Sequence, residues 1–173
     1  MARLRLVTQL AAAEIGETYN QYARSPLLQD RLERYLERMN DAAILLVGEA
    51  AGYRGARVSG LPFTSERQLT GAGPAEATAT IVHCVLAELG IENEVLLWNV
   101  VPTHPHRPGR PASNRRPSAK EIAAARPFLD ELACGRQVVP VGRVAEAVLG
   151  IEGIRHPSHG GAAAFRAGLA RLA

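Results

Sequence analysis

Residues 45–53 read Leu-Leu-Val-Gly-Glu-Ala-Ala-Gly-Tyr, an apolar run that ends abruptly in Gly48 and Glu49 and continues into small residues. A short apolar run that stops at a turn signal predicts a buried β-strand. In open α/β sheets, ligands bind beyond the carboxyl ends of the strands. The sequence therefore predicts that Glu49 lies at the rim of a sheet, where its carboxylate can act on a ligand. A solvated loop glutamate is the alternative.

Polar side chains also follow two other predicted strands. The strand at 95–99 ends in Trp98 and Asn99, and a short strand at 153–155 is followed by His156, Pro157 and Ser158. We therefore expect an amide and an imidazole to join the Glu49 carboxylate at the same edge of the sheet. The alternatives are an asparagine that closes a turn and a structural histidine before a proline.

Strands alternate with helices along the chain. We expect strands at 42–47, 95–99, 137–141 and 153–155, and helices at 8–24, 75–89, 118–133, 142–149 and 161–172. A further helix begins at Ser25 and Pro26, and residues 52–63 form a glycine-rich loop. Such alternation is typical of a parallel sheet with helices on both faces. The sequence thus predicts an α/β protein, a three-layer α/β/α sandwich with a central four-stranded parallel sheet, in one domain of residues 1–173.

The composition favours a globular protein of the reduced cytosol. The chain has 173 residues, of which 47% are hydrophobic, enough for one domain with a substantial core. Neither a membrane span of roughly 20 apolar residues nor a signal-peptide pattern is found. The two cysteines, Cys84 and Cys134, are too few for a structural zinc site or an iron–sulfur cluster. We therefore expect a monomeric cytoplasmic protein, associated with the bacterial nucleoid, that binds no metal, no cofactor and no membrane.

Positive charge is concentrated in one segment. The net charge is only +3, but Lys120 is the only lysine, so nearly all of the positive charge is arginine, whose planar fork suits phosphate. A GC-rich genome that favours arginine codons is an alternative cause. The proline-rich segment 102–117, called the basic loop below, has no acidic residue and contains His104, His106, Arg107, Arg110, Arg115 and Arg116. We expect these side chains to face DNA, with the four arginines on phosphates.

Five short motifs carry a resemblance to a known family. In chain order they are Gly-Glu-Ala-Ala-Gly at 48–52, Leu-Pro-Phe at 61–63, Trp-Asn-Val-Val at 98–101, Asn-Arg-Arg-Pro at 114–117 and His-Pro-Ser at 156–158. Their order and spacing resemble those of the uracil-DNA glycosylase superfamily from about residue 43 onward. The most similar class is that of bacterial and archaeal enzymes whose first motif reads Gly-Glu-x-Pro-Gly, although Ala51 replaces the proline here.

Enzymes of that class usually hold an iron–sulfur cluster with four cysteines, and this chain departs from them. Pro102-Thr103-His104 and Ala125 stand where two of the cysteines are expected. We therefore predict that the chain has no iron–sulfur cluster.

The resemblance implies a monofunctional DNA glycosylase that flips uracil out of DNA and hydrolyses its N-glycosidic bond, leaving an abasic site. Glu49 would orient the attacking water and face the positively charged sugar, while a neutral His156 would donate a hydrogen bond to the uracil anion. Phe63 would stack on the base, and the amide of Asn99 would read its N3–H and O4 groups. The other residues expected to contact the substrate are Gly48, Ala50, Gly52, Tyr53 and Ser158.

Two details of these motifs bear on the substrate. Some uracil enzymes carry at the place of Gly52 a tyrosine that excludes a 5-methyl group; glycine leaves room there, although Tyr53 could fill it. After Ser158 we expect His159 and Gly160 to contact DNA, through backbone N–H groups on a phosphate and with His159 as the only sizeable wedge.

Two alternatives to uracil excision stay open. The first keeps the chemistry but changes the base to hypoxanthine, xanthine or the thymine of a G:T mismatch. The second is a non-catalytic module that binds flipped bases or single-stranded DNA.

Overall fold

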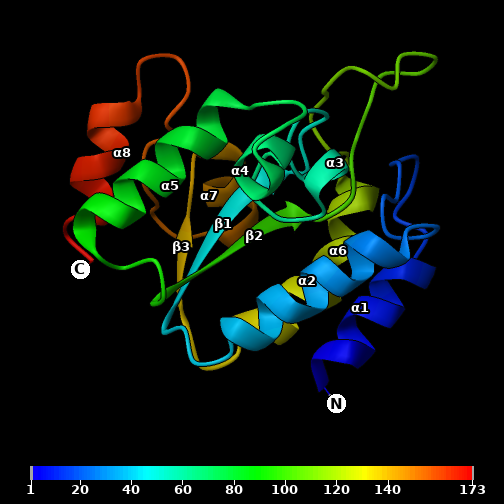
Figure 1. The fold of residues 1–173 in the computed structure, drawn as a ribbon, viewed down its shortest axis with the longest axis horizontal. Helices are drawn as coiled ribbons and strands as arrows, with labels where there is room; N and C mark the ends of the chain where they lie inside the picture. The colour runs from blue at the N-terminus through cyan, green and yellow to red at the C-terminus, as the bar shows by residue number, and fades with distance from the viewer. Residues whose placement is uncertain (1, 173) are drawn as a thin grey trace.

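A small parallel sheet forms the centre of the computed structural model, which describes residues 2–172 of the chain and the side chains of residues 5–172. The strands are β1 (Ile44–Ala50), β2 (Val95–Val101) and β3 (Gln137–Pro140), in the spatial order β2-β1-β3 (Figure 1). Both pairings are parallel, and Gly48 of β1 lies opposite Asn99 of β2. The predicted α/β class with a parallel sheet is confirmed. The prediction of four strands is wrong, because the sheet has three.

The segment predicted as the fourth strand contributes a single bridge residue. Ile154 accepts a hydrogen bond from Gly142 N at 2.9 Å and donates one to Pro140 O at 2.8 Å, and pairing goes no further. A Cβ on Gly153 would overlap the backbone of Pro140, so the chain crosses β3 too closely to continue alongside it. Pro157 lacks the N–H that a longer ladder would need. The bridge nevertheless brings the next residues to the carboxyl edge of the sheet.

Helices with clear capping signals form where they are predicted. Helix α2 (Pro26–Arg38) has Ser25 as its N-cap, and α6 (Ala119–Ala133) begins with a capping box of Ser118 and Glu121. Helix α5 (Ala77–Leu89) ends at Gly90 with a φ of 68°, a left-handed conformation that glycine adopts without strain. The remaining predicted helices are α7 (Arg143–Leu149) and α8 (Ala162–Leu169), the latter shorter than expected.

Three helical segments differ from the prediction. Helix α1 covers Ala2–Ala12 rather than residues 8–24, because the chain turns at Gly16, whose φ is 54°. A side chain at Gly16 would press against Glu121 of α6, so the turn fits closely on that helix. The short helices α3 (Ala56–Ser59) and α4 (Glu66–Thr70) lie where a loop or no element is predicted, since one helical turn leaves little periodic signal.

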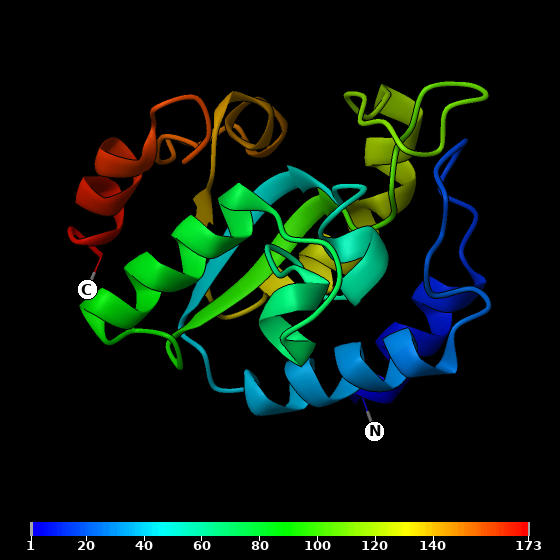
Figure 2. The same cartoon turned by 45° about the horizontal axis from the view of Figure 1, so that its top comes forward.

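Helices cover both faces of the sheet. In the two views, α5 lies on one side of the strands and α6, which packs against β2, lies on the other (Figures 1 and 2). Every residue of β2 is buried, as expected for a strand covered on both faces. This packing fixes the carboxyl ends of β1 and β2. Within residues 2–172, no helix is both long and apolar enough to cross a membrane.

Candidate active site

A cavity of about 470 Å³ lies beyond the carboxyl ends of β1 and β2, a size that suits a small ligand. Among its lining residues are six that the sequence predicts for substrate binding or catalysis: Glu49, Ala50, Gly52, Phe63, Asn99 and His156. Three residues of the predicted DNA-contacting set, Arg115, Arg116 and His159, also line it. The structure therefore gathers motifs that are more than 100 residues apart in the sequence around one cavity.

Glu49 is the carboxylate at the end of β1. Burial raises the pKa of Glu49 above its usual range, while the positive charge of Arg116 opposes that rise. Within the described side chains, no group donates a hydrogen bond to the Glu49 carboxyl. The carboxylate is therefore open to a water molecule or a developing positive charge in the cavity.

Asn99 lies near the end of β2, opposite Gly48 of β1, and is only 4% exposed. Among the described residues, its side-chain amide has no hydrogen-bond partner, although the residue lines the cavity. The amide atoms are not among the buried side-chain atoms that lack a partner, so they face the cavity rather than the closed core. The donor and the acceptor of Asn99 are thus left for a ligand.

Gly48 does not line the cavity, but its lack of a side chain leaves room for two residues that do. A Cβ built on Gly48 would overlap the ring of Phe63 and would lie 2.8 Å from Asn99 Oδ1. The ring and the amide therefore meet directly above the β1 backbone. A flat apolar surface beside an unpaired amide is a suitable receptor for a nucleobase.

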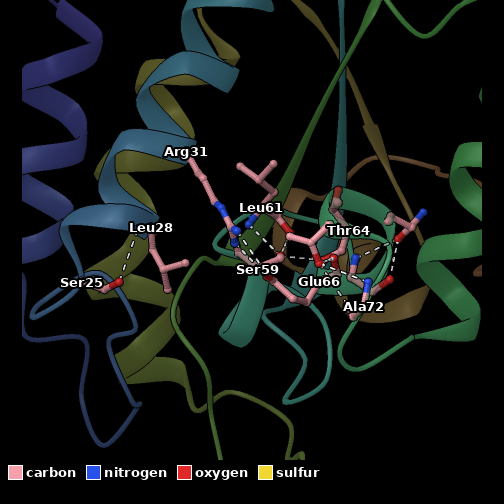
Figure 3. A network of polar contacts seen from close by, with 11 residues as sticks. Ser25, Leu28, Arg31, Ser59, Leu61, Thr64, Glu66 and Ala72 are labelled. Atoms are coloured by element: carbon pink, nitrogen blue, oxygen red, sulfur yellow. Dashed lines mark hydrogen bonds and ion pairs between the residues drawn. The ribbon is translucent and has the colours of Figure 1, made fainter.

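A network of hydroxyl groups fixes the backbone that carries Phe63. The φ of Phe63 is 50°, a strained value for a bulky residue. The buried Ser59 hydroxyl donates to Thr64 O at 2.7 Å and accepts from Leu61 N at 3.0 Å (Figure 3). On the other side, the Thr64 hydroxyl donates to Pro62 O at 3.0 Å and lies 3.0 Å from His83 Nε2. These bonds compensate for the strain at Phe63.

An ion pair connects this network to α2. Arg31 contacts both oxygens of Glu66, at 2.8 and 3.0 Å, and donates to Ser59 O at 3.2 Å (Figure 3). About one fifth of each charged side chain is exposed, so water screens the pair only in part. Arg31 thus joins α2, the Ser59 turn and α4 on the outer side of the Phe63 loop.

His156 is held by the residue two positions after it. Ser158 N donates to His156 Nδ1 at 3.2 Å, and the Ser158 hydroxyl lies 2.7 Å from the same nitrogen. Because Nδ1 accepts, the neutral ring carries its proton on Nε2. Burial, followed by the charges of Arg155 and His159, lowers the pKa of His156, which favours this neutral form. Ser158 therefore orients His156 rather than lining the cavity itself.

The arginines of the basic loop fall into two groups. Arg107, Arg110 and Arg116 are exposed, whereas Arg115 makes a two-point ion pair with the buried Glu121, at 2.6 and 2.8 Å. Arg115 also donates to the carbonyl oxygens of His106 and Arg116, so four of its five N–H groups are used within the chain. The structure thus gives Arg115 an anchoring role, which leaves little of it for a phosphate. Arg107 and Arg110 lie outside the cavity lining, as do Tyr53 and Gly160.

The sequence predicts that His104 faces DNA with the rest of the basic loop, but the structure places its side chain inside the protein. It is fully buried, with Nδ1 2.8 Å from Ala51 O and Nε2 3.2 Å from Pro111 O. Its ring joins the basic loop to the segment that follows β1. The sequence could not reveal this, because both partners are backbone atoms.

Six residues that line the cavity were not predicted as site residues from the sequence: Ala51, Ala56, Glu76, Thr78, Pro105 and Asn114. Asn114 accepts a hydrogen bond from Tyr53 N at 3.0 Å. It therefore links the basic loop to the residue that follows the first motif. Glu76 and Thr78 come from the start of α5. An isolated glutamate before a helix carries no pattern that distinguishes it from a solvated residue.

The two cysteines do not fit an iron–sulfur cluster. Cys84 on α5 and Cys134 after α6 are both exposed, and a four-thiolate site would need twice as many cysteines as the chain contains. Within the described part of the chain, no group of three or more His, Cys, Asp or Glu side chains is arranged to hold a metal ion.

Comparisons with known proteins agree with this arrangement. A family model described as the uracil DNA glycosylase superfamily matches residues 36–168. The structure is similar to the crystal structure of wild-type SMUG2 from Pedobacter heparinus, with a TM-score of 0.62 and 15% sequence identity, covering 85% of this chain and 79% of that one. It is one of 23 chains of solved structures that match. At this identity the likeness bears on the fold alone. No curated protein sequence matches the chain.

Proposed function

Because the chain belongs to the uracil DNA glycosylase superfamily, we propose that it removes uracil from DNA by hydrolysing the N-glycosidic bond of a flipped-out nucleotide. The observation that carries this proposal is the unpaired amide of the buried Asn99 beside the ring of Phe63. The first step is extrusion of the base from the stack into the cavity.

Recognition of uracil follows from the hydrogen-bonding pattern of Asn99. Uracil presents an N3–H donor beside the O4 acceptor, which complements an amide oxygen and an amide NH2. Cytosine presents the reverse pattern, so each mismatched group would leave a buried polar atom unpaired at a cost of about 1–3 kcal/mol. Stacking on Phe63 contributes binding without distinguishing between the two bases. The pocket therefore selects uracil through one side chain.

Cleavage of the bond produces an oxocarbenium-like sugar and a uracil anion. The Glu49 carboxylate faces the sugar and orients the attacking water. The Nε2–H of neutral His156 donates to O2 of the uracil, and a donor of this kind commonly contributes about 2.7–4 kcal/mol to the transition state. The two groups thus stabilise charges of opposite sign on either side of the breaking bond.

The reaction uses water rather than a lysine as the nucleophile. Lys120, the only lysine, is exposed in the first turn of α6 and is not among the residues of the cavity. Since a Schiff base requires a desolvated amine close to the sugar carbon, Lys120 is unsuited to form one. The expected product is an intact strand with an abasic site.

A base-release assay tests the proposal. An end-labelled oligonucleotide with one uracil should break only after alkali or heat, and borohydride should trap no covalent adduct. Matched oligonucleotides with cytosine, thymine, hypoxanthine or xanthine at the same position identify the preferred base. Faster excision of a purine than of uracil would reject uracil as the main substrate. Strand cleavage without alkali, or a trapped adduct, would contradict hydrolysis by water.

A further inference from the structure

A histidine on α5 contacts the loop that carries Phe63, and the chemistry described above gives it no role. His83 lies in the middle of α5, and its ring is half-buried. Its Nε2 lies 3.0 Å from the Thr64 hydroxyl, and the ring also has a hydrogen bond with the backbone of Phe63. His83 is not among the residues that line the cavity. It can therefore act on a bound base only through another residue.

The direction of the hydrogen bonds shows which nitrogen of His83 carries a hydrogen. The Thr64 hydroxyl has one hydrogen, which it donates to Pro62 O at 3.0 Å. The same hydroxyl then accepts from His83, so the neutral ring carries its hydrogen on Nε2. Burial lowers the pKa of His83, which favours the neutral ring. These two bonds connect His83 to the residues immediately before and after Phe63.

The place of the Phe63 ring depends on a strained backbone. The φ of Phe63 is 50°, a conformation that a bulky residue keeps only where its surroundings hold it. A Cβ on Gly48 would overlap the ring, which therefore lies close over the β1 backbone and beside Asn99 Oδ1. If the φ of Phe63 relaxed, the ring would leave this place beside the amide. Stacking on a base thus depends on the bonds made by residues 62 and 64.

His83 also connects two sides of the cavity. Thr78 lines the cavity from the start of α5, and Phe63 lines it from the loop. A second contact between the loop side and α5, from Gln68 Nε2 to Ala79 O at 3.3 Å, does not involve the neighbours of Phe63. The bond from His83 therefore fixes the stacking ring relative to the α5 side of the cavity.

We propose that His83 is a positioning residue for base stacking, which donates from Nε2 to the Thr64 hydroxyl and so holds Phe63 in the conformation that faces a flipped base. The proposal rests on the proposed function, in which that base is uracil. The N–H donor, rather than the bulk of the ring, is then what the site needs at this position. A side chain with an N–H donor of similar reach should replace the imidazole, whereas an apolar side chain of the same length should not.

The test compares two affinities in each variant. One oligonucleotide carries 2′-fluoro-2′-deoxyuridine, whose glycosidic bond resists hydrolysis because the fluorine destabilises positive charge on the sugar. The other carries a tetrahydrofuran abasic site at the same position, so the ratio of the two affinities measures binding of the base alone. We expect His83→Met to lower this ratio about tenfold, as for a lost stacking contact, with the affinity for abasic DNA unchanged. His83→Gln, which has the length of Met and an N–H donor, should keep most of the ratio.

The matched control is Cys84→Ala, because Cys84 is the exposed neighbour of His83 on the same helix and forms no disulfide. It should leave both affinities unchanged. Equal losses in His83→Gln and His83→Met would overturn the proposal, since the donor would then make no difference.

A double-variant cycle tests whether His83 acts through Thr64. Thr64→Val should lower the affinity ratio by a similar factor, and the double variant His83→Met/Thr64→Val should lose no more than either single variant. Losses that multiply in the double variant would overturn the proposal, because the two side chains would then act independently.

Thermal unfolding checks that each variant is folded. If His83→Met does not fold, Thr64→Val decides in its place, because an unchanged ratio there would show that the Thr64 hydroxyl does not hold Phe63. An unchanged ratio in folded His83→Met, with uracil still excised by the wild-type protein, would overturn this proposal and leave the proposed function intact. Equal affinity of the wild-type protein for the two oligonucleotides, together with no release of uracil, would overturn both.

Discussion

Asn99 illustrates at the residue scale how the site depends on a single side chain. Its amide is buried and unpaired, and its oxygen lies beside the ring of Phe63. We predict that Asn99→Asp weakens the discrimination between uracil and cytosine, because it removes the donor to O4 and, when protonated, offers cytosine the pattern that it needs. The measurement is excision of both bases by the variant and the wild-type protein.

Asn99→Ala is the companion to this variant, because it removes both polar groups without creating the cytosine pattern. It should slow uracil excision and produce no gain on cytosine. Unchanged uracil excision in Asn99→Asp, with no cytosine excision, would show that another residue reads the base.

The pH dependence of catalysis follows from two titrating groups. In the proposed mechanism, Glu49 acts as a carboxylate and His156 as a neutral imidazole, so both must be deprotonated. Burial raises the pKa of Glu49 and lowers the pKa of His156. The single-turnover rate should therefore rise with pH, and the part of the rise that is due to His156 should be complete by about pH 6.5, the ordinary pKa of histidine. A rate that falls between pH 6 and pH 8, at about the ordinary pKa of histidine, would instead indicate an imidazolium donor.

Which residues could be predicted from the sequence depends on how each is held. Glu49, Asn99, Phe63 and His156 follow strands or occupy short motifs, so their chemistry is readable from local sequence. Glu76 is brought to the cavity by the packing of α5 and by the absence of side chains at two glycines. No local pattern records that contact.

At the element scale, the Phe63 loop is held from outside by α2. We predict that Arg31→Gln slows uracil excision about tenfold, because it removes the two-point contact with Glu66 and the bond to Ser59 O that support the strained turn. Arg34→Gln is the control on the same helix, since the Arg34 side chain is 76% exposed and pairs with Asp30 at the surface.

Rescue by a conservative variant separates positioning from general stability. Arg31→Lys keeps the charge and should recover part of the excision rate, while both Arg31 variants should affect the KM for a uracil oligonucleotide more than Arg34→Gln does. Equal rates in Arg31→Gln and Arg34→Gln would show that the contacts of Arg31 with Glu66 and Ser59 O do not position Phe63.

Prediction of the elements succeeded where capping signals are strong. The helix starts at Ser25 and at Ser118 are set by side chains that bond to their own helices, so local sequence is sufficient. The helix expected at 8–24 fails because Gly16 adopts a left-handed turn against Glu121, which lies over 100 residues away. The expected fourth strand fails because pairing depends on the distance to β3, which the sequence does not contain.

At the scale of the whole molecule, the basic loop exposes three arginines, Arg107, Arg110 and Arg116, of which Arg116 also lines the cavity. We predict that replacing Arg107, Arg110 or Arg116 with Gln lowers the slope of log affinity against log salt concentration by about one unit each, regardless of DNA sequence, as for a lost phosphate contact. Arg115→Gln should change the slope less, because Glu121 already neutralises its charge. Arg34→Gln is the control, because Arg34 lies on the exposed face of α2, pairs with Asp30 and is not among the residues that line the cavity.

An unchanged slope in a double variant of Arg107 and Arg110 would show that the tip of the basic loop does not contact DNA.

The fold class of the whole molecule could be predicted from the sequence, because alternating strands and helices allow few arrangements. Which arginines of the basic loop stay exposed could not be predicted, since this depends on which of them pairs with Glu121 in the folded protein.

The role of Glu49 can be measured through the single-turnover rate of Glu49→Gln on a uracil-containing oligonucleotide. The amide keeps the size of the side chain but cannot offer negative charge to the sugar or accept a proton from water. We predict a rate lower by on the order of 10²-fold or more, with affinity for uracil-containing DNA and the unfolding temperature close to those of the wild-type protein. A wild-type rate in this variant would contradict the assignment of Glu49 and the mechanism built on it.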